Sequence, residues 1–431
     1  MKKLLIIIII HLKYHVKPYP KLEEIIINFL NHFPVLKMKI KRLGNHKTYY
    51  ESFVSTRKNR ELLIDVTHVY TEDLKTGIQR VVRSISNELE NNDLLKNMDI
   101  QPIFLTDRQG FWCYRYVKAP EVMVVPKKND IFLGLDLVAS VTEASFAGLF
   151  DDWKLRGVEI NFVVYDILPI LHPYWWQRGI GLAHEAWLKT VLCYSDQMIC
   201  ISKSVSDDVR EYLTQHTSEI HNQPTISWFH LGADIDNSIP SKGMPEDAAF
   251  ILNQLKSVPT FLSVGTVEPR KGYKQTLEAF EKLWKDSMDI NFVVVGKQGW
   301  MVDELATKMR NHPELNKRLF WLEGISDEYL EKVYASSTCL IAASEGEGFG
   351  LPLIEAAQHK LPIIARDISV FREVAGDYAY YYAHNNDPDV LTETITKWLE
   401  LYKTNSYPKC DNMPWLTWPE STKKIIKLLN I

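Results

Sequence analysis

The sequence predicts an α/β protein made of two doubly wound domains that face a central cleft. Three observations support this prediction. The chain has 431 residues, which is long for one domain and ordinary for two. Its hydrophobic content of 46% is enough for full cores. Short apolar runs also alternate with helix-length polar or amphipathic stretches, as βαβ units require, and this alternation occurs twice along the chain.

The apolar runs form two sets of expected strands. One set lies at residues 61–66, 98–105, 121–126, 130–135, 161–166, 198–202 and 226–231. The other set lies at residues 260–265, 290–296, 318–324, 339–344, 362–367 and 378–382. Between the sets, residues 236–249 are rich in Pro, Gly, Ser and Asn, which is typical of a linker. We therefore expect an N-terminal domain at residues 61–240, a C-terminal domain at residues 241–410 and a ligand-binding cleft between them.

The two ends of the chain have patterns of their own. Residues 1–60 contain 13 Lys or Arg and three acids, a balance of +10, whereas the other residues have a balance of −14. No apolar stretch in this basic arm approaches the ~20 residues of a spanning helix. The arm fits a segment held at a membrane surface, and a helix packed on the body is the alternative. Residues 411–431 place Thr417 and Glu420 in capping-box spacing ahead of an apolar helix face.

Several classes of protein are disfavoured by composition and motifs. The five cysteines are odd in number and lack metal-site spacing, so we expect free thiols in a reducing compartment, the cytoplasm. A basic arm on an acidic body is not the profile of a nucleic-acid-binding protein. No GxGxxG follows the first strand and no GxxxxGK occurs, which disfavours a dinucleotide-dependent dehydrogenase and a P-loop enzyme.

Two glutamates eight residues apart, Glu347 and Glu355, are the most informative feature of the chain. They enclose the run GFGLP, whose Pro352 suits the first turn of a helix. The run predicts a strand, a glycine turn and a helix N-terminus whose free N–H groups suit a phosphate. Eight helical residues span at most ~12 Å, comparable to the stretch from sugar to ribose in a nucleotide-diphosphate-sugar. The alternative is a buried helix start with two incidental acids. The predicted binding positions in the turn are Gly348, Phe349, Gly350 and Leu351.

A basic loop upstream supplies matching positive charge. An apolar strand ends at Val264, and Gly265 and Thr266 begin a turn that carries Arg270 and Lys271. Loops at the carboxyl edge of a parallel sheet are where α/β proteins bind ligands. Arg can grip a phosphate with two N–H groups, and Lys acts as a compact point charge. We therefore expect Arg270 and Lys271 to bind a diphosphate, with a solvated loop as the alternative.

Together these segments resemble the retaining, nucleotide-sugar-dependent glycosyltransferases of the GT-B fold, glycosyltransferase family 4 (group 1). The resemblance covers residues 62–431 and is most specific in the last third. In chain order it rests on TGIQRVV (76–82), VVYDILPILHP (163–173), CISKSVSDDV (200–209), FHLGAD (229–234), VGTVEPRKG (264–272), VVGKQGW (294–300), SEGEGFGLPLIE (344–355) and IARDISVFREVAGD (364–377). The YDILP and GKQGW stretches resemble bacterial enzymes that build O-antigen, capsular or other surface polysaccharides. The resemblance implies two Rossmann-like domains and a C-terminal helix, within residues 411–431, that crosses back to the N-terminal domain.

The resemblance implies roles for Glu347 and Glu355, and the helix after the first strand implies roles for Gly77 and Arg80. Glu347 would bind or polarise the donor sugar, and Glu355 would take the ribose hydroxyls. Gly77 would bring backbone N–H groups near the diphosphate. Arg80 would face the acceptor or a phosphate, and a surface ion pair is the alternative.

Other positions carry less defined expectations. Asp166 ends an apolar strand where relatives place a His or Asp beside the sugar, and the alternative is an Asp that caps its own turn. His172 is expected to be a structural loop histidine. Gly324 and Ile325 lie where the resemblance puts the nucleobase. Thr266 stands where some relatives carry an additional Arg, and we expect Arg270 to compensate for it.

The expected chemistry follows from charge. Breaking the anomeric bond drives negative charge onto the departing diphosphate, and preorganised donors there lower the barrier. Arg270, Lys271 and the amides of the glycine turn can supply these donors, so we expect no metal and no cofactor. The two DxD strings, at residues 234–236 and 387–389, are expected to serve as turns.

We therefore expect a retaining glycosyltransferase that moves a hexose from GDP-mannose, or from a UDP-sugar, to a glycan or lipid-linked glycan acceptor. Such an enzyme would work in the cytoplasm, and at the cytoplasmic face of the inner membrane where the N-terminal arm binds lipid. One alternative is a nucleotide-sugar epimerase of the same fold, which would transfer nothing. The other is a non-catalytic nucleotide-sugar-binding protein.

Overall fold

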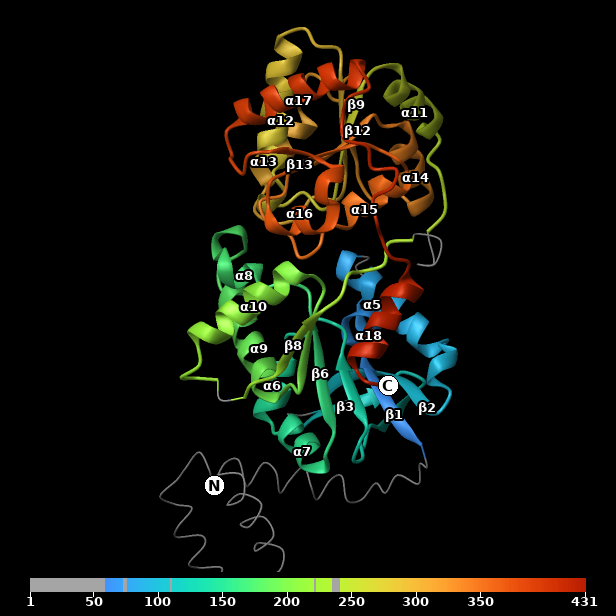
Figure 1. Cartoon of the computed structure of the whole chain (residues 1–431), viewed down its shortest axis with the longest axis vertical. Coiled ribbons are helices and arrows are strands. Elements are labelled where there is room, and N and C mark those ends of the chain that lie inside the picture. The colour runs from blue at the N-terminus through green and yellow to red at the C-terminus, as the bar shows by residue number, and fades with distance from the viewer. Residues whose placement is uncertain (1–58, 73–75, 109–110, 221, 235–240) are drawn as a thin grey trace, which may run out of the picture.

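Two α/β domains, the N-terminal one lying below the C-terminal one in Figure 1, make up the described part of the chain. The computed structural model describes residues 59–72, 76–108, 111–220, 222–234 and 241–431. The predicted fold class of two doubly wound domains is confirmed. The N-terminal arm up to residue 58, residue 235 and residues 236–240 of the expected linker lie outside the described residues. Among the helices that are described, none is both long and apolar enough to cross a bilayer.

The N-terminal domain is built on an eight-stranded sheet of order β4-β3-β2-β1-β5-β6-β7-β8. The strands are β1 (Arg60–Asp65), β2 (Met98–Arg108), β3 (Phe111–Tyr116), β4 (Ala119–Met123), β5 (Ile131–Gly134), β6 (Glu159–Val164), β7 (Gln197–Cys200) and β8 (Thr225–Trp228). Neighbours from β2 through β1 to β8 pair in parallel, whereas β3 pairs antiparallel with β2 and β4. β3 is a strand that the sequence did not predict, because it mixes aromatic and charged residues and lacks the apolar run of a parallel core strand.

Helices connect these strands. They are α4 (Thr67–Thr71), α5 (Gly77–Glu90), α6 (Val141–Phe146), α7 (Leu149–Arg156), α8 (Leu168–Leu171), α9 (Ile180–Tyr194) and α10 (Lys203–Gln215), with short 3-10 turns η1 (Asp93–Leu95) and η2 (Pro173–Trp175). α5 begins at Gly77 as expected, since Thr76 and Gln79 form a reciprocal capping box.

The C-terminal domain is built on a six-stranded, all-parallel sheet of order β11-β10-β9-β12-β13-β14. The strands are β9 (Thr260–Val264), β10 (Asn291–Val295), β11 (Leu319–Leu322), β12 (Cys339–Ala342), β13 (Ile363–Arg366) and β14 (Tyr380–Tyr382). Each of them coincides with a predicted strand. All five residues of β10 are buried, as expected for a parallel strand covered on both faces.

The helices of this half end with one that returns to the N-terminal domain. They are α11 (Ala248–Ser257), α12 (Tyr273–Lys285), α13 (Asp303–Arg310), α14 (Asp327–Ser336), α15 (Leu351–Gln358), α16 (Ser369–Ala375), α17 (Pro388–Lys403) and α18 (Trp418–Leu428), with 3-10 turns η4 (Pro269–Lys271) and η5 (Gly376–Tyr378). α18 packs against α5 in the lower domain (Figure 1). Its start carries the capping box of Thr417 and Glu420 that the sequence predicts.

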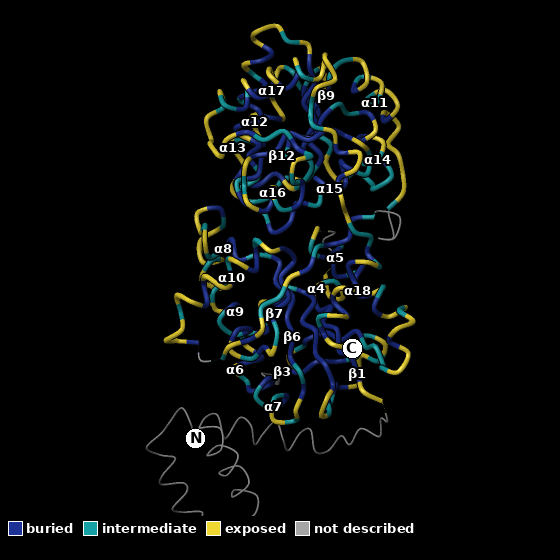
Figure 2. The backbone as a smooth tube through the Cα atoms, viewed as in Figure 1, coloured by how far each residue is buried: buried dark blue, intermediate teal, exposed yellow. Residues whose placement is uncertain are grey.

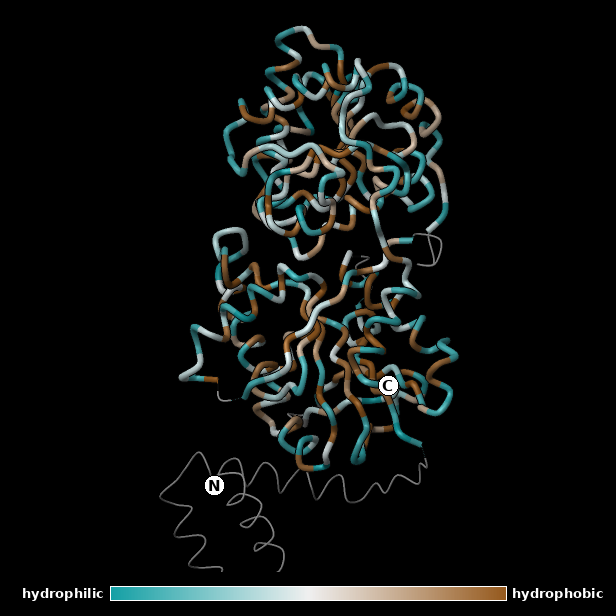
Figure 3. The backbone as a smooth tube through the Cα atoms, viewed as in Figure 1, coloured by the Kyte–Doolittle hydropathy of each residue, from teal (hydrophilic) through white to brown (hydrophobic). Residues whose placement is uncertain are grey.

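Apolar burial stabilises both domains, and one buried cluster includes residues of each. Figure 2 shows buried backbone along both sheets and exposed residues on the outer helices and loops, and Figure 3 shows the central strands as hydrophobic. In the N-terminal domain the rings of Phe132, Phe150 and Trp153 pack with centroids 5.3 to 6.0 Å apart. In the C-terminal domain Trp398 of α17 packs edge-on against Phe261 of β9. All five side chains are fully buried, each contributing roughly 1.5–3 kcal/mol of burial free energy.

Candidate active site

The glycine turn between β12 and α15 has the geometry that the sequence predicts. Gly350 precedes the helix with φ of 97°, in the left-handed region that favours glycine, and a proline lies in the first turn of α15. A Cβ on Gly348 would lie 2.2 Å from the carbonyl oxygen of Tyr165, which follows β6. The Ser202 hydroxyl, which follows β7, donates to the Gly348 carbonyl at 2.8 Å. The carboxyl ends of both sheets therefore meet at this turn.

Glu347 is held by a group of polar side chains inside the turn. One carboxylate oxygen lies 2.5 Å from the Lys271 Nζ and the other lies 2.8 Å from the Arg270 guanidinium. The Ser344 hydroxyl also donates to the carboxylate at 2.7 Å. Burial acts to raise the pKa of Glu347, but the charges of Lys271 and Arg270 outweigh it and lower the pKa to about 2. The carboxylate is therefore ionised at neutral pH.

Arg270 is shared between two carboxylates. Besides Glu347, it forms an ion pair with Glu268 at 2.7 Å and donates to the Gly346 carbonyl at 2.8 Å. Burial acts to lower the pKa of Arg270, but the two glutamates hold the pKa above its ordinary value. Burial raises the pKa of Glu268. The bidentate phosphate grip expected of Arg270 would therefore need exchange of one of these carboxylates.

Lys271 lies against the start of its own loop, at Gly265. Gly265 has φ of 137°, and a Cβ there would lie 3.5 Å from the Lys271 Nζ. The Tyr273 hydroxyl donates to the Gly265 carbonyl at 2.6 Å. Thr266 is exposed beside it. Gly265, Lys271 and Glu347 thus come together at the carboxyl edge of the sheet, as the sequence predicts.

Glu355 makes contacts that the sequence did not predict. One of its oxygens forms an ion pair with Arg80 of α5 at 2.7 Å, and the other accepts from the Tyr334 hydroxyl at 2.7 Å. The Glu355 side chain is 4% exposed. Arg80 therefore forms an ion pair, one of the two options considered, but this pair is largely buried and joins the two domains. The ribose contact of Glu355 stays a prediction, as does the diphosphate contact of Gly77, which has open space beside it.

Asp166 and His172 take structural contacts on the N-terminal side of the cleft. One carboxylate oxygen of Asp166 accepts from the Leu168 backbone N–H at 3.0 Å, which is the turn-capping alternative. Its charge still acts on Arg270 across the cleft. His172 lies 3.2 Å from the Tyr174 hydroxyl and packs on the Trp175 ring with centroids 4.2 Å apart. Burial lowers the pKa of His172.

The remaining predicted positions lie on either side of the glycine turn. Gly324 follows β11 with φ of 66°, and its neighbour Ile325 is half-buried. Phe349 is buried, with its ring 5.4 Å from that of His230 in the N-terminal domain. Leu351 is half-buried at the start of α15. Phe349 therefore packs the domain interface, and no contact of the other three residues identifies a nucleobase.

Sequence reasoning missed the residues that join the domains. Glu373 of α16 accepts hydrogen bonds from the backbone N–H groups of Lys203 and Ser204 and from the Ser204 hydroxyl. Its Oε1 also lies 2.8 Å from the His230 Nε2. Burial acts to raise the pKa of Glu373, but these donors, His230 foremost, lower it to about 2. Glu373 lies in a segment of the family resemblance, but no sequence signal paired it with α10.

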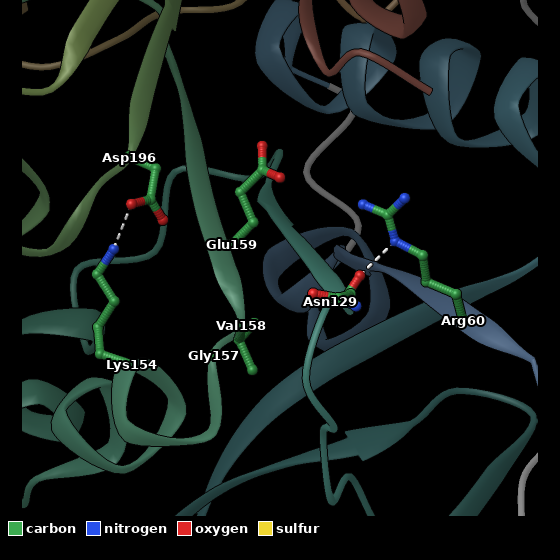
Figure 4. A pocket seen from close by; sticks show the side chains of 7 residues that line it. All are labelled: Arg60, Asn129, Lys154, Gly157, Val158, Glu159 and Asp196. Atoms are coloured by element: carbon green, nitrogen blue, oxygen red, sulfur yellow. Dashed lines mark hydrogen bonds and ion pairs between the residues drawn. The ribbon is translucent and has the colours of Figure 1, made fainter.

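Neither a group of metal ligands nor a cavity in the N-terminal domain provides another candidate site. Within the described ranges no three His, Cys, Asp or Glu side chains are grouped to hold a metal ion, and Asp387 of the second DxD string caps α17. A cavity of about 550 Å³ lies at the amino ends of β1, β6 and β7, away from the cleft (Figure 4). Its Lys154 and Asp196 are paired with each other at 2.6 Å, and Arg60 donates to the Asn129 carbonyl.

The architecture matches solved glycosyltransferases with two facing domains. HepE from Anabaena, solved in complex with UDP and glucose, aligns with a TM-score of 0.60 at 12% identity, covering 86% of this chain and 100% of that one. Sucrose-phosphate synthase from Thermosynechococcus elongatus aligns with a TM-score of 0.56 at 14% identity, covering 86% of this chain and 95% of that one. Identities this low show the fold alone, and that fold is GT-B.

Sequence comparison relates the chain to known glycosyltransferases. The family model described as Glycosyl transferases group 1 matches residues 246–412. The serotype-specific mannosyltransferase WbdA of Escherichia coli is 42% identical over 388 residues, which cover 87% of this chain and 47% of WbdA. Residues 246–412, which make up most of the C-terminal domain, therefore match the group 1 glycosyltransferases that the sequence resemblance implied. The whole chain spans about half the length of WbdA.

Proposed function

We propose that the chain is a retaining, metal-independent mannosyltransferase that uses GDP-mannose and extends a glycan or lipid-linked glycan of a surface polysaccharide. The observation that carries this proposal is the Glu347 carboxylate held between Arg270 and Lys271 at the glycine turn. Similarity to WbdA supports mannose as the transferred sugar, and UDP-hexoses are the second donor class. We place the reaction in the cytoplasm, at the inner membrane where the N-terminal arm contacts lipid.

Glu347 fits the role of a hydrogen-bond acceptor for the donor sugar. With a pKa lowered to about 2, it stays charged at physiological pH and does not act as a proton donor. As a fixed carboxylate it accepts from sugar hydroxyls and orients the anomeric carbon. The Lys271 ammonium forms an ion pair with the same carboxylate. It offsets the negative charge that develops on the departing diphosphate.

The reaction then needs no strong protein base. The bond between the anomeric carbon and the diphosphate oxygen breaks, and the acceptor oxygen bonds to the same face of that carbon. The acceptor proton passes to the departing diphosphate, which balances the charge. The backbone N–H groups at the start of α15 add further donors for the leaving group. Asp166, whose carboxylate caps its own turn, serves as a contact beside the sugar.

Product analysis with labelled GDP-mannose and a manno-oligosaccharide acceptor tests this function. We expect an elongated product with the anomeric configuration of the donor, formed equally well with EDTA. Lys271→Ala and Glu347→Ala should abolish the product. Epimerised donor without transfer would instead assign the epimerase alternative, and donor binding without any turnover would assign the non-catalytic one. An inverted product or a strict requirement for Mg²⁺ would contradict the proposed mechanism.

A further inference from the structure

Four aromatic side chains lie where the two domains meet, and none of them has a role in the proposed reaction. Tyr174, Trp175 and Trp176 follow α8 in the N-terminal domain, and Trp300 follows β10 in the C-terminal domain. Neighbouring ring centroids lie 5.6 Å apart for Tyr174 and Trp175, 6.0 Å for Trp175 and Trp176, and 6.4 Å for Trp176 and Trp300. We name these four residues the aromatic patch. The chain around α8 lies on the side of its domain that faces the upper domain in Figure 1.

One member of the patch anchors the others. Trp175 is 5% exposed and packs over Gly346, where a Cβ would lie 2.9 Å from its ring. The Trp300 indole N–H donates to the Trp175 carbonyl at 2.8 Å. The patch is therefore fixed to both domains and to the residue next to Glu347.

The other members keep aromatic surface open to solvent. Tyr174 is 66% exposed, and Trp176 and Trp300 are half-buried. The rings of Trp176 and Trp300 are nearly parallel, with an interplanar angle of 27°. Aromatic surface left open beside a cleft is typical of a binding site.

The patch lies beside the proposed position of the donor sugar. From one end of the 346–355 segment to the other, Trp175 contacts Gly346, Tyr165 contacts Gly348 and Arg80 pairs with Glu355. The patch therefore lies at the Glu347 end, where the donor sugar is proposed to bind, and away from the ribose end at Glu355.

We propose that the aromatic patch binds the terminal sugars of the acceptor glycan. This inference rests on the proposed function. A pyranose ring has an apolar C–H face that packs on an aromatic ring, while its hydroxyls remain at the edge to bond polar groups such as the Tyr174 hydroxyl. The acceptor must present a hydroxyl to the anomeric carbon beside Glu347, and the patch adjoins that point. Because Trp300 comes from the other domain, the acceptor site is complete only when the cleft is closed.

Kinetics with α-linked mannotriose as acceptor and GDP-mannose as donor test the inference. Tyr174→Ala and Trp300→Ala should each raise the KM for mannotriose about tenfold and leave the Kd for GDP-mannose within about twofold. Trp300→Phe, which keeps a ring but loses the N–H, should recover most of the acceptor affinity. Phe250→Ala, at a residue 64% exposed on α11, is the matched control and should change neither constant.

The outcomes separate this inference from the proposed function. Transfer by the unaltered chain tests the function, whatever the variants do. An unchanged KM for mannotriose in both alanine variants would overturn the acceptor site and leave the function standing. A weaker Kd for GDP-mannose with an unchanged acceptor KM would assign the patch to the nucleotide. Weaker binding to phosphatidylglycerol vesicles with an unchanged acceptor KM would assign it to lipid, which also overturns the inference.

Discussion

Glu373 offers a direct way to weaken the contact between the two domains. Its carboxylate accepts from the backbone N–H groups of Lys203 and Ser204 at 2.6 and 2.8 Å, at the N-terminus of α10 in the other domain. The positive end of the helix dipole adds to this attraction. Glu373→Gln keeps the shape and one acceptor oxygen but removes the charge. We expect the variant to fold and to open its cleft more often.

The magnitude follows from the pKa. A shift of the Glu373 pKa from 4.5 to about 2 corresponds to at most about 3 kcal/mol. Because the side chain is 13% exposed, solvent screening reduces the value to about 2 kcal/mol. A loss of about 2 kcal/mol raises the ratio of open to closed molecules about 30-fold. The folded pKa is the lower one, so this contribution is present above pH 4.5 and is lost as the pH falls toward 2.

Hydrogen exchange of the backbone amides that contact Glu373 measures how often the two domains separate. The amides of Lys203 and Ser204 should exchange about 30-fold faster in Glu373→Gln than in the unaltered chain at neutral pH, while the core of β10 keeps its protection. Glu393→Gln removes a carboxylate that is 69% exposed in a surface pair, and this control should exchange normally. Unchanged exchange at the start of α10 in Glu373→Gln would refute the reasoning.

Three further changes test other parts of the structure. Gly348→Ala places a Cβ 2.2 Å from the Tyr165 carbonyl oxygen. The variant should therefore separate the domains and lower kcat/KM about 100-fold. A near-normal kcat/KM would show that the turn moves freely. Arg80→Ala leaves the buried Glu355 carboxylate without its cation. The free energy of unfolding in urea should therefore fall by about 3 kcal/mol. A loss below about 0.5 kcal/mol would contradict a buried ion pair. Burial raises the pKa of Asp65 to about 7, so stability falls as the pH rises from 3.8 to 7. In Asp65→Asn, the free energy of unfolding in urea should fall less between pH 3.8 and pH 7. The same dependence on pH in the variant and in the unaltered chain would argue against the raised pKa.

The sequence predicted the fold well because its parallel strands are short apolar runs with clear limits. The six strands of the C-terminal sheet and seven of the N-terminal one coincide with such runs. β3 was not predicted because it belongs to the antiparallel extension of the N-terminal sheet, where a continuous apolar run is not required. Local turn chemistry was equally predictable, as Gly350 and the proline of α15 show.

The contacts between the domains were not predictable from local pattern. Arg80 and Glu355 are 275 residues apart, and Lys203 and Glu373 are 170 residues apart. Their pairing depends on how the two sheets face each other, which no periodicity encodes. For the same reason, the sequence indicated that Arg270 would face a phosphate and did not reveal its two carboxylate partners.

The turnover number of Lys271→Met tests the central claim most directly, since this variant keeps the length of the side chain and removes the charge beside Glu347. Lys282→Met removes an exposed lysine of α12 and provides the control. With saturating GDP-mannose and acceptor, we predict that kcat falls about 100- to 1,000-fold in Lys271→Met and stays unchanged in Lys282→Met. A kcat within about threefold of the unaltered chain in a folded Lys271→Met protein would contradict the claim that fixed cations at this turn stabilise the departing diphosphate.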